Sequence, residues 1–262
     1  MTDFDTAGLL TVLFVIGITA EAMTAAVSAG RMKMDLFGVI TLGALTGLGG
    51  GTVRDILLGA YPLTWVEEPK FLLVVIIASV ITVRISWLMY QLRRFFLVAD
   101  AIGLAAFVVL GIQVAVSEGH GFIIACVAAV TTGVSGGVMR DVLSDRVPLV
   151  FRKEMYASTA VIGTIVWWLL HNFGVVEWIN VVVTLATVLS LRLISLKRGW
   201  SLPIYEYDEE AVKAINPREE FTVFLSANGR KIPGARRAYR GLRRITQARP
   251  AKRDSRQRRP GK

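Results

Sequence analysis

Two stretches of this sequence place an Arg-Asp pair a few residues after a run of small residues. They run from Thr46 to Leu57 and from Thr132 to Leu143. Each Gly costs a helix interior roughly 1 kcal/mol relative to Ala, so we expect the helix to break or kink at each run. Backbone carbonyls freed by a kink are oxygen dipoles suited to cations. The small residues of the predicted kinks are Gly47, Gly49, Gly50, Gly51, Gly133, Ser135, Gly136 and Gly137.

The same small residues also fit close helix packing, because several of the glycines fall at four-residue spacing. What favours a functional site is the charged pair that follows in both copies, Arg54-Asp55 and Arg140-Asp141. A charged side chain at the centre of a bilayer costs at least about 2.5 to 3.5 kcal/mol on insertion scales, so it normally faces a polar cavity or a partner.

These charges can line a pore or bridge the two copies. Neighbouring residues point about 100° apart on a helix, so we hypothesise crossed pairing, Arg54 with Asp141 and Arg140 with Asp55. Purely structural bridging remains an equal alternative. Two further acids inside apolar runs, Glu21 and Asp100, can add cation-attracting charge. Asp100 lies near the predicted cytoplasmic end of its run, where a solvated interfacial carboxylate is the alternative reading.

The elements that carry these residues are predicted to be transmembrane helices. Hydrophobic residues make up 53% of the 262 residues and charged residues 19%, with a mean hydropathy of +0.54. An apolar run of about 20 residues is long enough to cross a hydrocarbon core of roughly 30 Å. Seven runs qualify, which predicts an all-α membrane protein with seven spans: Ala7–Val27, Leu36–Gly59, Phe71–Leu92, Phe95–Ser117, Gly121–Leu143, Met155–Leu170 and Val175–Leu196.

The two motifs belong to an internal repeat with an offset of 86 residues. Pro62 and Pro148 keep this offset, so the match extends beyond the motifs. Each repeat holds three spans, and three is odd, so the second repeat must be inverted relative to the first. We therefore predict a first repeat at 1–92, an inverted second repeat at 93–172, a seventh helix at 173–198 and a cytoplasmic tail at 199–262.

Loop charges predict the orientation. One side collects the basic loop residues, among them Arg31, Lys33, Arg146 and Lys197, and the other collects Glu67, Glu68, Glu118 and Glu177. Positively charged loops face the cytoplasm. We therefore expect a multi-pass protein of the cell membrane with its N-terminus outside and its C-terminus in the cytoplasm.

The tail differs sharply from the rest of the chain. Between 230 and 262 it has fourteen Lys or Arg and a single acidic residue, Asp254. So many like charges with few apolar residues predict disorder, and a basic segment beside a membrane gains about 1 kcal/mol per Lys or Arg near anionic lipid. We expect contact with anionic lipid, and no nucleic-acid partner.

No catalytic or cofactor-binding pattern is visible. His120 and His171 fall in predicted outer loops, away from any nucleophile or metal-ligand cluster. The glycine runs lack the Gly-Lys-Ser/Thr that a Walker-type phosphate loop needs. Cys126 is the only cysteine, so no intramolecular disulfide can form. We predict that the protein is not an enzyme and has no cofactor and no metal site.

With these motifs in hand, the sequence resembles the prokaryotic trimeric intracellular cation channels, also classified as a glycine transporter family. The resemblance rests on both glycine-rich motifs and on the segment from Asp100 to Phe107, and it covers roughly 7 to 196. It implies a homotrimer with a pore in each subunit, lined by the two kinked helices and conducting monovalent cations such as potassium and sodium. Phe14 departs from the pattern, because it occupies the first-repeat position equivalent to Asp100, where the resemblance leads us to expect an acid.

The sequence leaves two transport mechanisms open. Inverted repeats with broken helices suit a channel, but they also suit a secondary carrier of glycine or a similar small solute that works by alternating access. A scaffold without transport is a third, weaker alternative. A channel passes ions faster than any alternating-access cycle, whereas a carrier saturates and shows counterflow.

Overall fold

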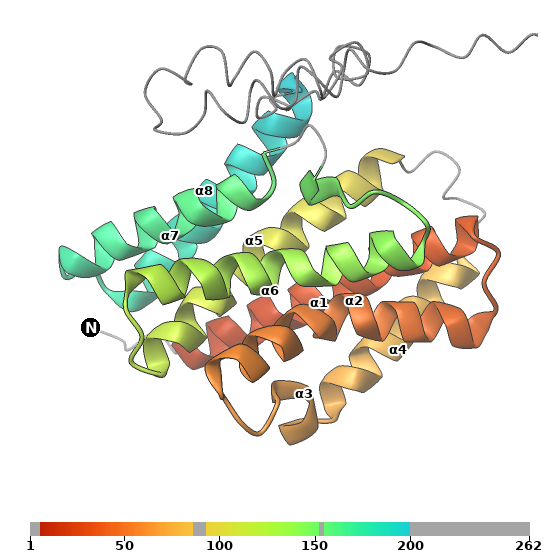
Figure 1. Cartoon of the computed structure of the whole chain (residues 1–262), viewed down its shortest axis with the longest axis horizontal. Coiled ribbons are helices and arrows are strands. Elements are labelled where there is room, and N and C mark those ends of the chain that lie inside the picture. The colour runs from red at the N-terminus through yellow and green to blue at the C-terminus, as the bar shows by residue number, and fades with distance from the viewer. Residues whose placement is uncertain (1–5, 86–92, 152–154, 200–262) are drawn as a thin grey trace, which may run out of the picture. The chain divides into compact units, whose positions relative to one another are not determined.

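The apolar runs form helices in the computed structural model, which describes residues 6–85, 93–151 and 155–199. All regular elements in this described part are helical, as predicted (Figure 1). The long helices are α1 (Thr6–Arg31), α2 (Leu36–Leu58), α4 (Lys70–Arg84), α5 (Arg93–Ser117), α6 (Phe122–Leu143), α7 (Ala157–Asn172) and α8 (Glu177–Arg198). Two short elements, α3 (Thr64–Glu67) and the 3-10 helix η2 (Leu149–Phe151), follow α2 and α6.

Five of these helices, α1, α2, α5, α6 and α8, are long and apolar enough to cross a membrane. Helices α4 and α7 have 15 and 16 residues, fewer than a perpendicular crossing needs. The predicted third span also extends into 86–92, outside the described residues. An all-α membrane protein is therefore confirmed, while the count of seven spans stays a prediction.

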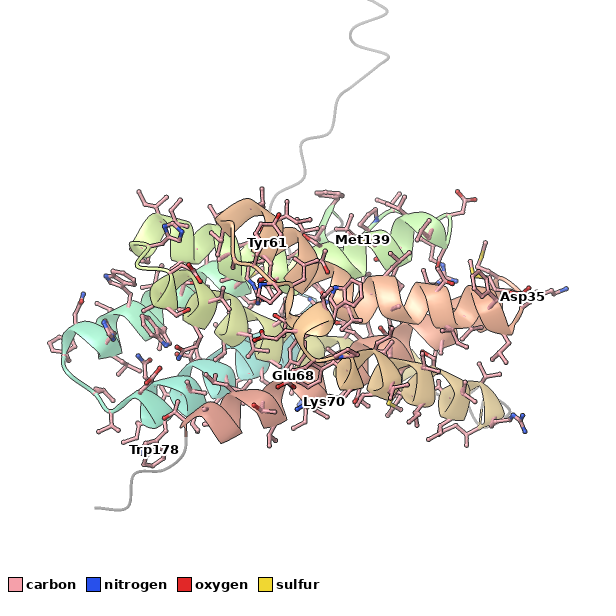
Figure 2. The ribbon with its side chains drawn as sticks, turned by 90° about the horizontal axis from the view of Figure 1, so that it is seen from below. Asp35, Tyr61, Glu68, Lys70, Met139 and Trp178 are labelled. Atoms are coloured by element: carbon pink, nitrogen blue, oxygen red, sulfur yellow. The ribbon has the colours of Figure 1, made fainter. Side chains whose placement is uncertain are left out.

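Local signals fix where helices begin and end. The Asp35 side chain caps α2 by accepting a hydrogen bond from the backbone N–H of Gly38 at 2.8 Å. Gly59, with φ of +70°, ends the same helix in the left-handed conformation that favours glycine. Figure 2 shows Asp35 and Trp178 toward opposite ends of the bundle.

Matching helices of the two repeats run in opposite directions. In Figure 1, α1 runs left to right and α5 right to left, while α2 and α6 are antiparallel neighbours. This is the direction that the sequence predicts from an odd number of spans in each repeat. The predicted boundaries of the repeats fall between these helices, and both the boundaries and the assignment of a seventh helix stay predictions. Nearly all of the predicted tail, 199–262, lies outside the described residues.

The helix ends fall into two groups. We call the side with Glu67, Glu68, Glu118 and Glu177 the acidic end, where α2, α5 and α7 finish. The opposite side, where α1, α4, α6 and α8 finish, is the basic end; it carries Arg31, Lys33, Arg146, Lys197 and Arg198. Which end faces the cytoplasm stays a prediction.

Both glycine-rich helices run without a break, so a break is contradicted, while a kink within the continuous helix stays a prediction. The hydrogen-bonded helix continues from Leu36 to Leu58 and from Phe122 to Leu143. Tertiary packing overrides the low helix propensity of glycine. A Cβ on Gly50 would collide with the backbone carbonyl of Thr132, and a Cβ on Gly136 would collide with that of Thr46. The glycines therefore let α2 and α6 cross in close contact.

Candidate functional site

Each arginine of the repeated motif pairs with the aspartate beside it in sequence. Arg54 Nε and Nη2 donate to Asp55 Oδ1 at 2.8 and 2.6 Å. Arg140 Nε donates to Asp141 Oδ1 at 2.9 Å. The predicted crossed pairing is therefore wrong. Because the repeats are inverted, one pair lies near the acidic end of α2 and the other near the basic end of α6, too far apart to exchange partners.

The aspartates also hold the short helices that follow. Asp55 Oδ2 accepts hydrogen bonds from the Thr64 hydroxyl at 3.3 Å and the Thr64 N–H at 3.5 Å, at the start of α3. Asp141 Oδ2 accepts from the backbone N–H of Leu149 at 2.9 Å, at the start of η2. Each Arg-Asp pair thus links a long helix to its connecting segment.

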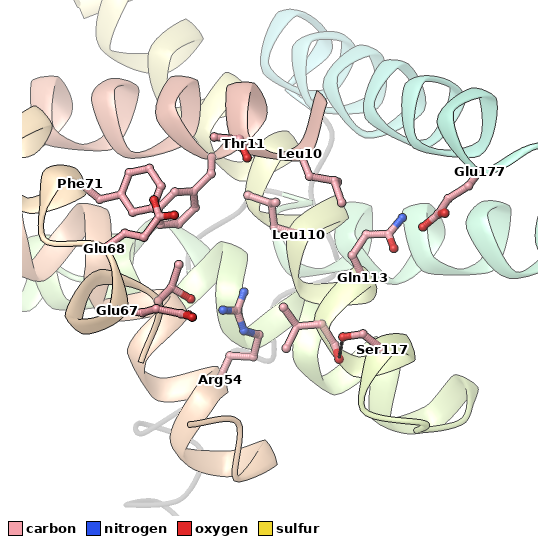
Figure 3. A pocket seen from close by; sticks show the side chains of 13 residues that line it. Leu10, Thr11, Arg54, Glu67, Glu68, Phe71, Leu110, Gln113, Ser117 and Glu177 are labelled. Atoms are coloured by element: carbon pink, nitrogen blue, oxygen red, sulfur yellow. Dashed lines mark hydrogen bonds between the residues drawn. The ribbon is translucent and has the colours of Figure 1, made fainter. Parts of the chain in front are cut away.

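A cavity of about 490 Å³ lies at the acidic end. Arg54 extends into it from α2, between Glu67 on one side and Ser117 on the other (Figure 3). Glu177 enters from the start of α8, and the exposed side chains at the rim show that the cavity opens at the surface. The lining residues are Leu10, Thr11, Phe14, Arg54, Thr64, Glu67, Glu68, Phe71, Leu110, Gln113, Val114, Ser117 and Glu177.

Acids outnumber bases around this cavity. Three glutamates and one arginine line it, and Glu68 forms an ion pair with Lys70, which lies beside it in Figure 2. Arg54 is already neutralised by Asp55. The cavity therefore presents a negative surface, with one arginine at its base.

The region around Arg140 is closed and packed with charges. Arg140 Nη1 reaches Asp100 Oδ1 at 2.9 Å, the Thr24 hydroxyl at 3.0 Å and Glu21 Oε2 at 3.4 Å. Its guanidinium lies 4.8 Å from the centroid of the Phe96 ring. The hollow that Arg140 lines together with η2 has no room for a water molecule. Asp100 is fully buried here, so its reading as a solvated interfacial carboxylate is wrong.

Helix α8 completes this group from outside the repeats. Arg192 Nη2 lies 3.8 Å from Asp100 Oδ2, and its guanidinium stacks 4.5 Å from the centroid of the Tyr156 ring. Arg192 and Arg140 are both fully buried. We call this set, which joins α1, α5, α6 and α8, the basic-end cluster: Glu21, Thr24, Asp100, Arg140, Asp141, Tyr156 and Arg192.

The structure separates the predicted site residues into three places. Arg54 is the one that lines the cavity, with Asp55 beneath it. Glu21, Asp100, Arg140 and Asp141 meet in the basic-end cluster. The predicted kink glycines pack between helices: Gly47 lies against α1 and α4, Gly49 against Met139, and Gly133 against α5. A Cβ on Gly51 or on Gly137 would lie 3.6 Å from Nη2 of Arg54 or of Arg140, an ordinary van der Waals contact, and Ser135 is half-buried.

Several residues of the cavity and of the basic-end cluster were not predicted. Arg192 and Gln113 each interrupt an apolar run, so the rule that singled out Glu21 and Asp100 would have found them. Thr24 and Tyr156 carry no such signal, because neither residue type is unusual in an apolar run. Glu67 and Glu177 were assigned to outer loops, and nothing in their spacing indicated that α3 and α8 bring them to one cavity.

Comparisons with known proteins agree with this architecture. A family model described as "Glycine transporter" matches residues 11–87 and 97–172, so the two matched segments begin 86 residues apart, the offset of the internal repeat. The chain is 36% identical over 199 residues to the UPF0126 inner membrane protein YadS of Escherichia coli (strain K12), covering 75% of this chain and 96% of the relative. It is 35% identical over 196 residues to the UPF0126 membrane protein YvgT of Bacillus subtilis (strain 168), covering 73% and 94%.

A solved structure is similar as well. The orthologue of the trimeric intracellular cation channel from Rhodobacter sphaeroides superposes with a TM-score of 0.71 at 34% sequence identity. The match covers 73% of this chain and 98% of that protein. The similarity therefore extends over nearly the whole of the solved chain and leaves about a quarter of this one unmatched.

Proposed function

The chain belongs to the glycine transporter family, which includes the prokaryotic trimeric intracellular cation (TRIC) channels, and from that membership we propose that it is a membrane channel for monovalent cations. The pore lies within each subunit and conducts potassium and sodium. Three subunits assemble as a homotrimer. The similar protein from Rhodobacter sphaeroides, an orthologue of a trimeric channel, supports this assembly. The basic end faces the cytoplasm, in line with the positive-inside rule.

The cavity at the acidic end is the outer entrance of this pore. Its glutamates raise the local concentration of cations, because a cleft lined by one sign of charge attracts counter-ions. Arg54 lies at the base of the cavity and is neutralised by Asp55, so it narrows the path without repelling cations with a full charge.

Beyond Arg54 the path follows α2 and α6 past the small residues of the two motifs, Gly47, Gly49, Gly50, Gly51, Gly133, Ser135, Gly136 and Gly137. In the conformation described, Gly47, Gly49, Gly50, Gly133 and Gly136 are packed against other helices, so the path is not open there. Gly51 supports this route, because it lies on the side of α2 where the Arg54 guanidinium reaches the cavity. Gly50 and Gly136 sit in the helix crossing, so ions pass only when α2 and α6 shift relative to each other.

The basic-end cluster closes the pore in the conformation described. Arg140 contacts side chains from α1, α5 and its own helix, and the hollow that it lines with η2 has no water-sized space. Breaking a buried ion pair is costly, about 3 to 5 kcal/mol when one partner is removed. Opening therefore requires that α6 move together with Arg140 or that the cluster change its charge.

The observation that carries this proposal is the acidic cavity at Arg54, at the end of the bundle opposite the buried charge cluster at Arg140. We would record single channels from the purified protein in planar bilayers with unequal KCl on the two sides. The expected result is unitary currents that reverse near the potassium equilibrium potential and whose amplitude changes in Arg54→Gln. Absence of unitary currents from reconstituted, correctly folded protein would contradict the proposal.

A carrier of glycine or a similar small solute is the second candidate. The favouring observation is that the cavity brings Arg54 together with glutamates, which suits a zwitterion with one carboxylate and one ammonium group. Glycine counterflow in liposomes, with saturation and without unitary currents, would establish this alternative. Counterflow that persists in Arg54→Gln would show that the solute does not pass through this cavity.

A further inference from the structure

The charges of the basic-end cluster do not balance. Three carboxylates, those of Glu21, Asp100 and Asp141, meet two guanidiniums, those of Arg140 and Arg192. All five side chains are at most 5% exposed as residues. With every group ionised, the cluster carries one excess negative charge. An uncompensated buried charge is expensive, and such groups normally become neutral.

The contacts identify which carboxylate is in excess. Asp141 accepts from Arg140 Nε and from the Leu149 N–H, both at 2.9 Å. Asp100 has Arg140 at 2.9 Å and Arg192 at 3.8 Å. Glu21 has one arginine contact, at 3.4 Å, which is the longest that Arg140 makes. Its remaining hydrogen bond comes from the Thr24 hydroxyl at 3.2 Å.

The surroundings of Glu21 disfavour its ionised form. Its Oε1 atom is buried and has no hydrogen-bond partner among the described residues. Among the described residues, the charged groups facing Glu21 are Asp100 on α5 and Arg140 and Asp141 on α6, two acids against one base. Arg192 on α8 lies behind Asp100, and Tyr156, which stacks on Arg192, is neutral. Helices α2 and α4 also pack on α1, and their charged residues Arg54, Asp55, Lys70 and Arg84 lie toward the helix ends, away from Glu21.

We propose that Glu21 is a proton-binding site and that the bound proton holds the basic-end cluster closed. With the proton in place, Asp100 and Asp141 balance Arg140 and Arg192, and the excess charge disappears. The carboxylic acid keeps the shape of the carboxylate, so no neighbour has to move. The role of Glu21 in gating rests on the proposed channel function, but proton binding by Glu21 does not.

A metal cation does not fit this position. Sodium or potassium needs a shell of several oxygen ligands, whereas the site is filled by the helix backbone. A Cβ on Gly103 would come within 2.6 Å of Glu21 Oε1, so α5 packs directly on the carboxyl group. A proton binds to the oxygen itself and needs no cavity.

The proton also gives a direction for pH effects. In the unfolded chain Glu21 is ionised above about pH 4.3, the reference value for glutamate, so the folded protein binds one proton more at neutral pH. Folding is therefore favoured at low pH and weakens as pH rises, by up to tenfold in the unfolding constant per pH unit. Loss of the proton leaves Glu21 facing Asp100 and Asp141, and that repulsion favours opening.

The first experiment compares reversible unfolding of the full protein in mixed micelles between pH 5 and pH 8. The variants are Glu21→Gln, which keeps the shape of the protonated acid, and Glu118→Gln, an exposed acid of the acidic end, as control. The unfolding constant of wild type and Glu118→Gln should rise by up to tenfold per pH unit relative to Glu21→Gln. Equal pH dependence in all three proteins would overturn the proposal.

Two further measurements separate the alternatives. Infrared spectra of the wild type should contain the carbonyl stretch of a protonated carboxylic acid at neutral pH; if that band is missing, the proposal fails even where Glu21→Gln does not fold. Exchange of potassium for choline at constant ionic strength should change nothing. If replacing potassium by choline changes the stability of the wild type but not that of Glu21→Gln, the site binds a metal cation instead.

Bilayer recordings then test the link to the pore. Open probability should increase with pH in wild type and be independent of pH in Glu21→Gln. If Glu21→Gln conducts with the wild-type pH dependence, Glu21 does not control opening. If no variant conducts at any pH while the unfolding data show the proton, the channel function fails and the proton site stands.

Discussion

The regions around Arg54 and around Arg140 share one sequence motif, but the structural environments of the two arginines differ. In both, the arginine pairs with the next aspartate, and that aspartate holds the following short helix. Around Arg54 the result is an open cavity, and around Arg140 it is a closed cluster. The motif itself therefore does not determine whether an open cavity or a closed cluster forms.

Residues on the neighbouring helices make the difference. At the offset of 86 residues, the equivalents of Glu21, Thr24 and Asp100 are Phe107, Leu110 and Phe14. The cluster side has polar partners for its arginine at all three positions, and the cavity side has apolar residues, of which Phe14 and Leu110 line the cavity. An arginine without partners from other helices leaves space, whereas one with three draws the helices together.

The strongest test of this difference removes each arginine in turn. Arg140→Gln leaves the buried Asp100 and Asp141 with one remaining cation, Arg192, so we expect a loss of about 3 to 5 kcal/mol in the free energy of unfolding. Arg54→Gln leaves only Asp55 short of a partner, beside a cavity that opens at the surface, and should cost about 1 to 3 kcal/mol. Chemical unfolding of both variants measures the two losses. Equal losses would mean that the partners on α1 and α5 contribute nothing.

The helix crossing should respond equally on both sides. Gly50→Ala and Gly136→Ala each push a methyl group into a backbone carbonyl, and overpacking of this kind costs about 1 to 3 kcal/mol. The two losses should agree closely, because the contacts are reciprocal. Thermal unfolding compares them with Gly30→Ala, where a Cβ meets nothing within 4 Å and the gain in helix propensity should make the change neutral or slightly stabilising.

The smallest effect concerns the acidic rim of the cavity. Glu67→Gln with Glu177→Gln removes two of its charges, so potassium conductance at low salt should fall about two- to threefold, through a lower local cation concentration. The difference should vanish near 1 M KCl, where the screening length is about 3 Å. Glu118→Gln changes an acid of the same end that does not line the cavity, and should leave conductance unchanged at any salt concentration.

The sequence predicted the all-helical membrane fold well, because apolar runs are long-range patterns that single residues do not disturb. The bounds of the two repeats and the count of seven spans stay predictions. The two wrong predictions about the repeated motifs, the helix break and the crossed pairing, concern contacts between helices. Crossed pairing of Arg54 with Asp141 conflicts with the inversion itself, which sends the two motifs to opposite ends. The break at Gly50 was inferred from propensity alone, whereas the carbonyl of Thr132 on the neighbouring helix fills the space that the missing Cβ leaves.

The cavity and the cluster were only partly predictable. Glu21, Asp100 and Arg140 stood out as charges in apolar runs, and Arg192 satisfies the same rule. Which of them meet depends on helix rotation and register, which periodicity does not fix. The place of Glu67 depends on the short helix α3, whose position is set by its hydrogen bonds to Asp55 and not by any pattern in its own four residues.

The contact between α2 and α6 is self-complementary. Each helix supplies the same two features, a glycine and, four residues before it, a threonine carbonyl, and each glycine receives the carbonyl of the other helix. Such an interface is isologous, like that of a two-fold symmetric dimer, although it joins two parts of one chain. A single repeat would therefore carry a complete binding surface for an inverted copy of itself, so fusing two copies requires no new interface, only a connecting segment.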